Sequence, residues 1–212
     1  YEQAMALGTD YLYEKATQII DEDTQKTVVC ESGKRFTATA IIIATGTVER
    51  TLNIPGEMEM IGRGVSFCAV CDAAFYRNKP VVIVGAGNSA FEESLYLAEF
   101  ASHITILARS DKYTAEEITQ QKVKANPKIT ILPFRNSLEV MIENGKVAGM
   151  RVLNTQTNEE EIIPANGIFP YIGADPVTDF AKDLGITNAQ GYLVVNEDMS
   201  TAIPGIYGAG DV

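Results

Sequence analysis

Apolar residues in the first part of the chain come in short runs separated by polar turns. The runs at residues 27–30 and 35–38 flank a Ser32-Gly33 turn, and the apolar run 41–44 follows them. Runs of this length with turn residues between them are typical of strands rather than helices. Residues 10–44 are therefore predicted to form a small meander that leads into a buried strand.

From residue 81 the pattern changes to apolar strands that alternate with helical periods. The order strand, helix, strand, helix, strand predicts a right-handed unit of the doubly wound type. Thr114 and Glu117 have the spacing of a capping box, and Asn126-Pro127 is a stop signal, so the second helix is expected between them. The five predicted elements are residues 81–84, about 89–100, 104–107, about 115–125 and 129–132.

A second group of strands follows this unit. Strands at 138–142 and 147–153 flank Asn144-Gly145, a pair that favours a tight hairpin turn, and residues 161–164 add a third meander strand. Residues 167–173 then return to an apolar core strand.

The two chain ends and one internal segment complete the pattern. Residues 1–8 resemble the last turns of a helix closed by Gly8, and residues 205–212 resemble a strand that leads into a glycine turn. The start of a helix is expected before residue 1, and a further helix is expected after residue 212. The chain is therefore expected to be the middle of a longer protein. The turn-rich segment 47–56 is the candidate linker.

Composition and charge narrow the class of protein. The 212 residues are 46% hydrophobic, enough for one large core or two modest ones, and the net charge is −11. The charge argues against nucleic acid or an anionic membrane as partner. No apolar run approaches the roughly 20 residues of a membrane span, and the first residues do not resemble a signal peptide, so a cytoplasmic protein is expected. Three cysteines in such a chain point to chemistry rather than to a disulfide framework.

The pair Cys68 and Cys71 has the C-x-x-C spacing of a redox disulfide, and Asp72 follows directly. One thiol attacks as a thiolate while the other resolves, and Asp72 is placed to move a proton to the sulfur that leaves. Other interpretations are half a zinc site or two packed side chains, and Asp72 could instead cap a helix. A zinc site would need more ligands than Cys30, expected in the core, and His103, expected at a strand start.

The turn after the strand at 81–84 reads Gly85-Ala86-Gly87-Asn88-Ser89-Ala90. In a dinucleotide site Gly85 makes the tight turn, Gly87 lets the backbone approach the pyrophosphate, and Ala90 lets the helix pack on the strand. The phosphates would lie at the helix start near Asn88 and Ser89. A thiol pair and this turn together imply electron transfer from a nucleotide to a disulfide.

The end of the next strand bears on the choice of nucleotide. An acid here binds the ribose of NAD, whereas an arginine accommodates the 2′-phosphate of NADP. The segment 107–111 contains Arg109 and, slightly later, Asp111. The pattern favours binding of the 2′-phosphate of NADP by Arg109. The alternative is that Arg109 is a solvated surface residue without this role.

Four motifs in this order resemble the low-molecular-weight thioredoxin reductases, and the resemblance covers essentially the whole chain. A cysteine pair inside the nucleotide domain is specific to that family. The motifs are Ile43-Ala44-Thr45-Gly46, Cys68-Ala69-Val70-Cys71-Asp72, Gly85 to Ala90 with Glu92-Glu93, and Gly208-Ala209-Gly210-Asp211.

The resemblance implies an α/β fold in which a doubly wound, Rossmann-like NAD(P)-binding domain is inserted into a partial FAD-binding domain, each with a small antiparallel meander. The FAD-binding parts would be residues 1–50 and 168–212, and the nucleotide domain with the C-x-x-C would be 51–167. The crossings would fall near 48–51 and 167–169. The residues expected to contact the flavin are Thr45, Gly46, Gly210, Asp211 and Val212.

The resemblance also implies a function. Electrons would pass from NADPH to FAD, then to Cys68 and Cys71, and then to thioredoxin or a thioredoxin-like protein. Cys71 would be the flavin-proximal thiol, Cys68 the interchange thiol that attacks the partner, and Asp72 the acid. Members of the family form homodimers and alternate between two domain arrangements.

The chain departs from the family in two respects. Where the family has His-Arg-Arg-Asp-x-Phe-Arg for the 2′-phosphate, residues 108–114 keep only one of the three arginines, Arg109, with Ser110 next to it, so NADH or a donor such as ferredoxin is possible. The usual N-terminal glycine motif and C-terminal helix for FAD are missing, so the chain alone is expected to bind FAD poorly. Alternatives are the reductase portion of a peroxiredoxin-linked system and a nucleotide-binding module without redox activity.

Overall fold

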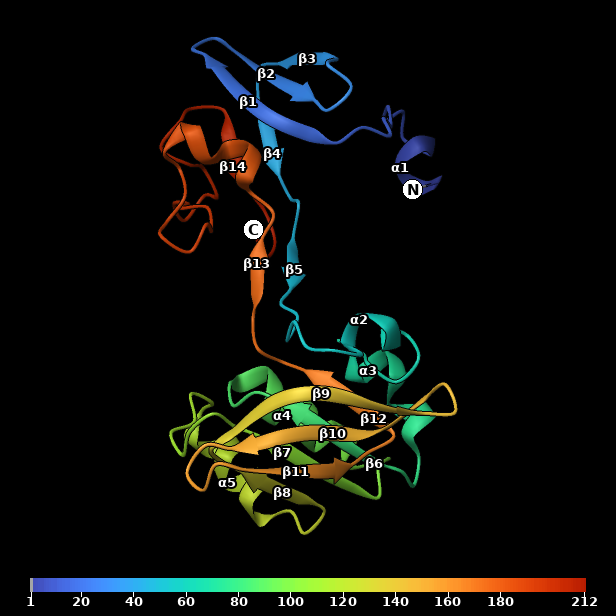
Figure 1. Cartoon of the computed structure of the whole chain (residues 1–212). Helices are drawn as coiled ribbons and strands as arrows, with labels where there is room; N and C mark the ends of the chain where they lie inside the picture. The colour runs from blue at the N-terminus through green and yellow to red at the C-terminus, as the bar shows by residue number, and fades with distance from the viewer. Residues whose placement is uncertain (1) are drawn as a thin grey trace. The chain divides into compact units, whose positions relative to one another are not determined.

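The computed structural model describes residues 2–212, which form two compact units (Figure 1). The split unit contains the chain up to Val48 together with Asp175–Val212, and the inserted unit is Glu49–Ala174. The first crossing between the units lies between Val48 and Glu49. The return lies later than the expected 167–169, because β12 (Gly167–Pro170) pairs with a strand of the inserted unit and belongs to that sheet. None of the helices in residues 2–212 is both long and apolar enough to span a membrane.

The inserted unit is built on a parallel sheet with the strand order β12-β6-β7-β8. The order runs outward in one direction from β6 to β8 and then returns to the other side of β6, as in half of a Rossmann fold. The topological switch point therefore lies between β6 and β12. The other elements are β6 (Pro80–Val84), α4 (Asn88–Leu97), β7 (His103–Leu107), α5 (Glu117–Ala125) and β8 (Ile129–Leu132).

Two different layers cover the faces of this sheet. Ile83 packs with Phe91 of α4 and Val123 of α5 on one face, whereas Val82 packs with Met150 on the other face. The alternation follows from the two-residue period of a strand, and burial on both faces explains the continuous apolar run in β6. Both predicted helices lie on the first face, so an antiparallel meander, rather than helices, covers the second.

The meander has the strand order β11-β10-β9 and agrees with the three strands that the sequence predicts. Asn144 and Gly145 have φ angles of 52° and 73°, the left-handed values that a two-residue hairpin turn requires. The strands are β9 (Arg135–Glu143), β10 (Lys146–Asn154) and β11 (Glu159–Pro164).

The capping box predicted for the second helix is wrong. The N-cap of α5 is Glu116, and no side chain caps it. The backbone N–H of Thr114 donates instead to the carbonyl oxygen of Ala86, with the Thr114 hydroxyl also pointing to that oxygen at 3.5 Å. Tertiary contact with the glycine turn therefore replaces the local cap, while Asn126 ends the helix as predicted.

The segment before the cysteines is held by a buried acid. After β5 (Thr47–Glu49), the carboxylate of Glu57 accepts hydrogen bonds from the amides of Leu52 and Asn53, both at 2.8 Å. Glu57 has 0% exposure, so these charge-assisted bonds compensate the burial of its carboxylate. The predicted linker 47–56 is thus ordered. The short helices that follow are α2 (Glu57–Met60), α3 (Ala69–Asp72) and the 3₁₀-helix η1 (Ala73–Tyr76).

The split unit contains a meander and a parallel strand pair. The meander has the order β1-β2-β3, and β4 pairs in parallel with β14. The predicted terminal helix is present as α1 (Glu2–Ala6) before Gly8, although Tyr1 lies outside the described residues. The other elements are β1 (Ala16–Glu22), β2 (Gln25–Cys30), β3 (Arg35–Ala38), β4 (Ile41–Ile43), β13 (Ala174–Pro176), η2 (Asp179–Leu184) and β14 (Ile206–Gly208).

Replacement of Gly85 by alanine should lower the free energy of unfolding by about 2–4 kcal/mol. Gly85 has a φ of +137°, and an added Cβ would overlap the carbonyl oxygen of Tyr171. Urea unfolding followed by circular dichroism measures the change. Gly87→Ala is the matched control, since its φ is not positive and its Cβ would find only the Thr114 hydroxyl, at 3.6 Å. Its cost should stay near 1 kcal/mol, and equal costs at the two positions would contradict the expectation.

Candidate active site

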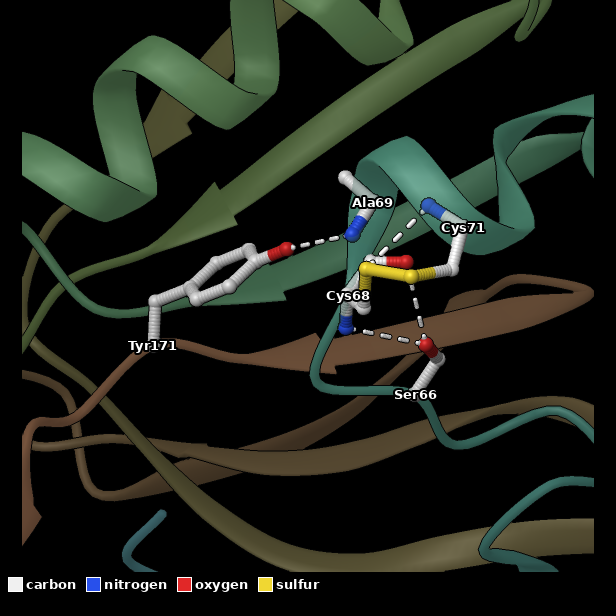
Figure 2. The surroundings of a disulfide bond; sticks show 5 residues. All are labelled: Ser66, Cys68, Ala69, Cys71 and Tyr171. Carbon is white, nitrogen blue, oxygen red and sulfur yellow. Dashed lines mark hydrogen bonds between the residues drawn. A yellow bond between two sulfur atoms is a disulfide. The ribbon is translucent and has the colours of Figure 1, made fainter. Parts of the chain in front are cut away.

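Cys68 and Cys71 form a disulfide at the start of α3 (Figure 2). Cys68 is the N-cap residue of this helix, and its Sγ accepts a hydrogen bond from the backbone N–H of Cys71 at 3.1 Å. The pair is therefore closed on itself rather than arranged as half a zinc site. Within residues 2–212, no three His, Cys, Asp or Glu side chains gather as a metal site would require. Cys30 is a buried free thiol on β2, as predicted.

Two hydroxyl groups hold the backbone at the start of α3. The Ser66 Oγ accepts the N–H of Cys68 at 3.1 Å, and the Tyr171 Oη accepts the N–H of Ala69 at 3.0 Å (Figure 2). The first amides of a helix have no partner within the helix, so they need side chains or water. With the bond to the Cys68 sulfur, side chains satisfy three of the amides between Cys68 and Cys71.

The two cysteines differ in access. Cys71 is exposed to solvent, whereas Cys68 is half-buried. The sulfur that accepts an amide hydrogen bond is that of Cys68. When the disulfide is reduced, this bond would stabilise negative charge on Cys68, while Cys71 is the residue that another molecule can reach.

Acidic and phenolic groups surround the base of this loop. Asp72 is half-buried at the end of α3, and its side chain makes no cap hydrogen bond to η1, so the helix-capping role is not observed. Burial raises the pKa of Tyr76, and the charge of Asp72 raises it further. Burial also raises the pKa of Tyr171 far above its usual range, with Glu93 as the next cause.

Glu93 was part of the sequence motif but had no predicted role. Its Oε2 is buried, and no hydrogen-bond partner is present among the described residues. Burial, followed by the charge of Glu92, raises the pKa of the Glu93 carboxyl. It lies on α4, which packs against α3.

The glycine turn joins β6 to α4 at the switch point of the sheet. Asn88 and Ser89 are exposed in the first turn of the helix, and Ala90 is fully buried against the strand. The open side of Gly87 leaves room for a group to approach the backbone. Crevices at the carboxyl ends of strands at a switch point are where open α/β sheets bind ligands. The turn therefore fits the pyrophosphate of a dinucleotide.

The loop after β7 is tied to this turn. The amides of Thr114 and Ala115 donate to the Ala86 carbonyl at 3.0 and 3.2 Å, and the amide of Glu116 donates to the Asn88 Oδ1 at 2.7 Å. The exposed Arg109 begins this loop. The side chain of Ser110 braces it from within, by bonds to the backbone of Lys112. The structure thus brings the predicted phosphate and ribose positions into one connected region.

The predicted flavin contacts lie together in the split unit, at the carboxyl ends of β4 and β14. The Thr45 hydroxyl donates to the Val177 carbonyl at 2.6 Å. Gly46 and Gly210 have φ angles of 71° and 79°, and a Cβ on either would meet no atom within 4 Å. Asp211 is exposed and Val212 is buried. Two open, glycine-containing turns on adjacent parallel strands fit part of a dinucleotide cradle, such as that for FAD.

Ser66 and Tyr171 are the residues of the cysteine site that sequence reasoning missed. Tyr171 lies in the predicted core strand 167–173, 102 residues from Ala69. No local pattern signals a hydrogen bond over that separation.

The family comparison agrees with this geometry. Residues 3–212 match the family model described as pyridine nucleotide-disulphide oxidoreductase. The chain belongs to this family. It is 42% identical over 212 residues to the thioredoxin reductase of Bacillus subtilis and 43% identical over 210 residues to that of Listeria innocua. These alignments cover 100% and 99% of the chain.

A solved relative has a similar fold. The crystal structure of Lactococcus lactis thioredoxin reductase is 41% identical, with a TM-score of 0.82, and the match covers 99% of this chain and 69% of that one. The chain spans about two thirds of the length of the curated relatives it matches, 67% of the Bacillus protein and 65% of the Listeria protein.

Asn88→Ala should weaken NAD(P)H binding about two- to tenfold. The substitution removes the acceptor that holds the Glu116 amide, so the loop that carries Arg109 loses one anchor. Isothermal titration of nucleotide measures the effect. Asn126→Ala is the control, because it removes a similar side-chain acceptor, for the Lys128 amide, at the other end of α5. Equal affinities in Asn88→Ala and the unchanged protein would show that the anchor does not serve binding.

Proposed function

We propose that this chain is the core of a flavin-dependent thioredoxin reductase, in which NAD(P)H reduces the Cys68–Cys71 disulfide through FAD and the thiols then reduce a protein disulfide. The observation that carries the proposal is the closed C-x-x-C disulfide in the same unit as an open glycine turn. Its relatives at 42% and 43% identity are named thioredoxin reductases. Thioredoxin or a thioredoxin-like protein is the proposed substrate, and a cytoplasmic homodimer is the proposed form at the relatives' full length.

The residues of the inserted unit would hold the nucleotide. The amides at the open end of α4, at Asn88 and Ser89, have no partner within the helix and would donate to the pyrophosphate. Gly85, Gly87 and Ala90 keep the turn narrow enough for this approach. Arg109 would pair with the 2′-phosphate of NADPH, with Ser110 supporting its loop.

The turns of the split unit would hold part of the flavin. Thr45 and Gly46 on one strand end, and Gly210 to Val212 on the other, leave backbone groups open where a dinucleotide approaches. When bound, FAD supplies the conversion of a hydride from the nicotinamide into two electrons for the disulfide.

The disulfide step follows from the hydrogen bonds of the cysteines. Two electrons and one proton convert the Cys68–Cys71 disulfide into a thiolate on Cys68 and a thiol on Cys71, and the Cys71 amide stabilises the thiolate. In the transfer, one cysteine attacks the partner's disulfide and releases a partner thiolate, to which Asp72 would deliver a proton. The second cysteine then attacks the mixed disulfide, which restores the Cys68–Cys71 bond and releases the reduced partner.

The exposures of the two cysteines favour an order of attack opposite to the one implied by the family resemblance. Cys71 is exposed and Cys68 half-buried, so Cys71 is the better placed to reach a protein partner. Cys68, with its thiolate held by an amide, is the better placed to resolve within the loop. We therefore propose that Cys71 passes its proton to the Cys68 thiolate, attacks the partner's disulfide as a thiolate, and is released again when Cys68, deprotonated in turn by Asp72, attacks the mixed disulfide.

Serine variants of the two cysteines test this function. In a protein of the relatives' full length that contains this chain, both Cys68→Ser and Cys71→Ser should lose NADPH-dependent reduction of thioredoxin. Cys68→Ser should still form a mixed disulfide with a thioredoxin that keeps only its first cysteine, activated as its disulfide with thionitrobenzoate, which leaves as the thiolate. Cys71→Ser should form it at least about tenfold more slowly because Cys68 is less accessible. Cys30→Ser is the control and should keep full activity. Faster trapping by Cys71→Ser would support Cys68 as the attacking thiol, and turnover by either active-site variant would refute the proposed function.

Arg109→Ala should raise the KM for NADPH about tenfold or more and leave the KM for NADH nearly unchanged. A charge-assisted contact to phosphate is worth about 1.5–3 kcal/mol, and residues 108–114 contain only one arginine. Steady-state kinetics with both nucleotides measures the change, with the exposed Arg77→Ala as the control. An unchanged preference would assign the 2′-phosphate to Ser110 or Lys112, and inactivity with both nucleotides would indicate another donor such as ferredoxin.

A further inference from the structure

Tyr171 connects two parts of the inserted unit that are far apart in sequence. It follows β12, and its backbone N–H donates to the Val84 carbonyl at 2.8 Å, at the end of β6. Its ring stacks on that of Phe169, with centroids 6.5 Å apart. From this fixed base the hydroxyl reaches the amide of Ala69 in the cysteine loop (Figure 2).

The Ala69 amide that donates to Tyr171 has no alternative acceptor. Ala69 is 1% exposed, so water does not reach its N–H, and the amide is the first of α3. A buried donor that loses its acceptor costs free energy, and the backbone shifts to recover a partner. The preceding amide, that of Cys68, is held in the same way by Ser66, which is 6% exposed. These two bonds set where the helix begins.

The start of α3 also sets the position of the Cys71 amide, which donates a hydrogen bond to the Cys68 Sγ. The Cys71 amide reaches the Cys68 Sγ only when the turn between them keeps its geometry. That bond is stronger to a thiolate than to a disulfide sulfur, because a charged acceptor strengthens a hydrogen bond. Displacement of the loop would therefore disfavour the reduced state more than the oxidised state.

The phenol of Tyr171 remains neutral where it is needed. Burial raises its pKa, and the acidic groups Glu93 on α4, Glu49 at the end of β5 and Asp72 on α3 raise it further. A neutral phenol accepts the Ala69 amide without placing a negative charge beside the sulfurs.

We propose that the hydroxyls of Tyr171 and Ser66 are positioning groups for the redox disulfide: they hold the amides of Ala69 and Cys68 so that the Cys71 amide stabilises the Cys68 thiolate. The inference rests on the proposed function in that the disulfide is the redox centre. Neither residue touches the reacting sulfur through its own proton. Their effect is on the equilibrium between the disulfide and the dithiol.

The test is the reduction equilibrium of Tyr171→Phe, which keeps the ring and removes the acceptor. The 212-residue chain is equilibrated with glutathione redox buffers at pH 7, and the state of Cys68, Cys71 and Cys30 is read by alkylation and peptide mass spectrometry. The ratio of dithiol to disulfide should fall about threefold to tenfold at a given buffer poise, since one hydrogen bond is lost. A tenfold fall corresponds to a potential about 30 mV more negative.

Tyr76→Phe is the matched control. Tyr76 is buried just after α3, and no hydrogen bond to its hydroxyl is present in residues 2–212. It should keep the equilibrium of the unchanged chain. An unshifted Tyr171→Phe, or an equal shift in both variants, overturns the proposal. Should Tyr171→Phe not fold, Ser66→Ala takes its place with the same expected direction, and an unshifted Ser66→Ala then overturns it.

This measurement separates the inference from the proposed function. Glutathione reduces the disulfide without nucleotide or flavin, so the shift is measured whether or not the protein accepts NAD(P)H. A shifted equilibrium with no NADPH-dependent thioredoxin reduction at the relatives' full length would refute the function and keep the positioning role. Full turnover with an unshifted equilibrium would do the reverse.

Discussion

The parallel pairing of β12 with β6 is the constraint on which the geometry of the inserted unit depends. This pairing brings β12, which comes late in the sequence of the unit, next to β6, the strand that leads into the glycine turn. The residue that follows, Tyr171, then lies with its carbonyl so close to Gly85 that only glycine fits there. The same residue places its hydroxyl on the cysteine loop. One strand pair therefore positions both the nucleotide turn and the disulfide.

The starts of α3 and α4 both have backbone amides without a partner inside the helix, but these amides have different surroundings. At the start of α3, side chains of Ser66, Cys68 and Tyr171 satisfy the first amides, so the cysteine loop is held without a ligand. At the start of α4, Asn88 uses its side chain to hold another loop, and the first turn is exposed. Amides that are already paired give a rigid loop, whereas unpaired amides at an open helix end attract an anion. This difference separates the redox site from the nucleotide site.

The disulfide is also chemically asymmetric. The Cys68 sulfur accepts a hydrogen bond from the Cys71 amide, whereas Cys71 is exposed. The two sulfurs therefore have different environments although the cysteines are only three residues apart. A leaving thiolate is easiest to form where a donor is already placed, and attack is easiest where solvent and partners have access.

Much of the fold is determined by the sequence alone, because its causes are local. The strand at 129–132 has the predicted bounds, the Asn144-Gly145 turn has the left-handed angles that these residues tolerate, and Asn126 before proline ends α5. The C-x-x-C spacing allows a disulfide within one turn, and the glycine motif predicts an open turn between strand and helix. Each of these features depends on a few consecutive residues.

The tertiary structure decided what depends on distant partners. Thr114 has the pattern of a helix cap but bonds to Ala86, because the glycine turn offers an acceptor that the local pattern does not reveal. The apolar strand 167–170 could have belonged to either unit, and its pairing with β6 places it in the inserted one. The roles of Ser66 and Tyr171 and the unequal exposure of the cysteines also appear only in the folded chain. Hydrogen bonds and burial of this kind are properties of residues brought together across long sequence separations, which apolar periodicity and short motifs do not encode.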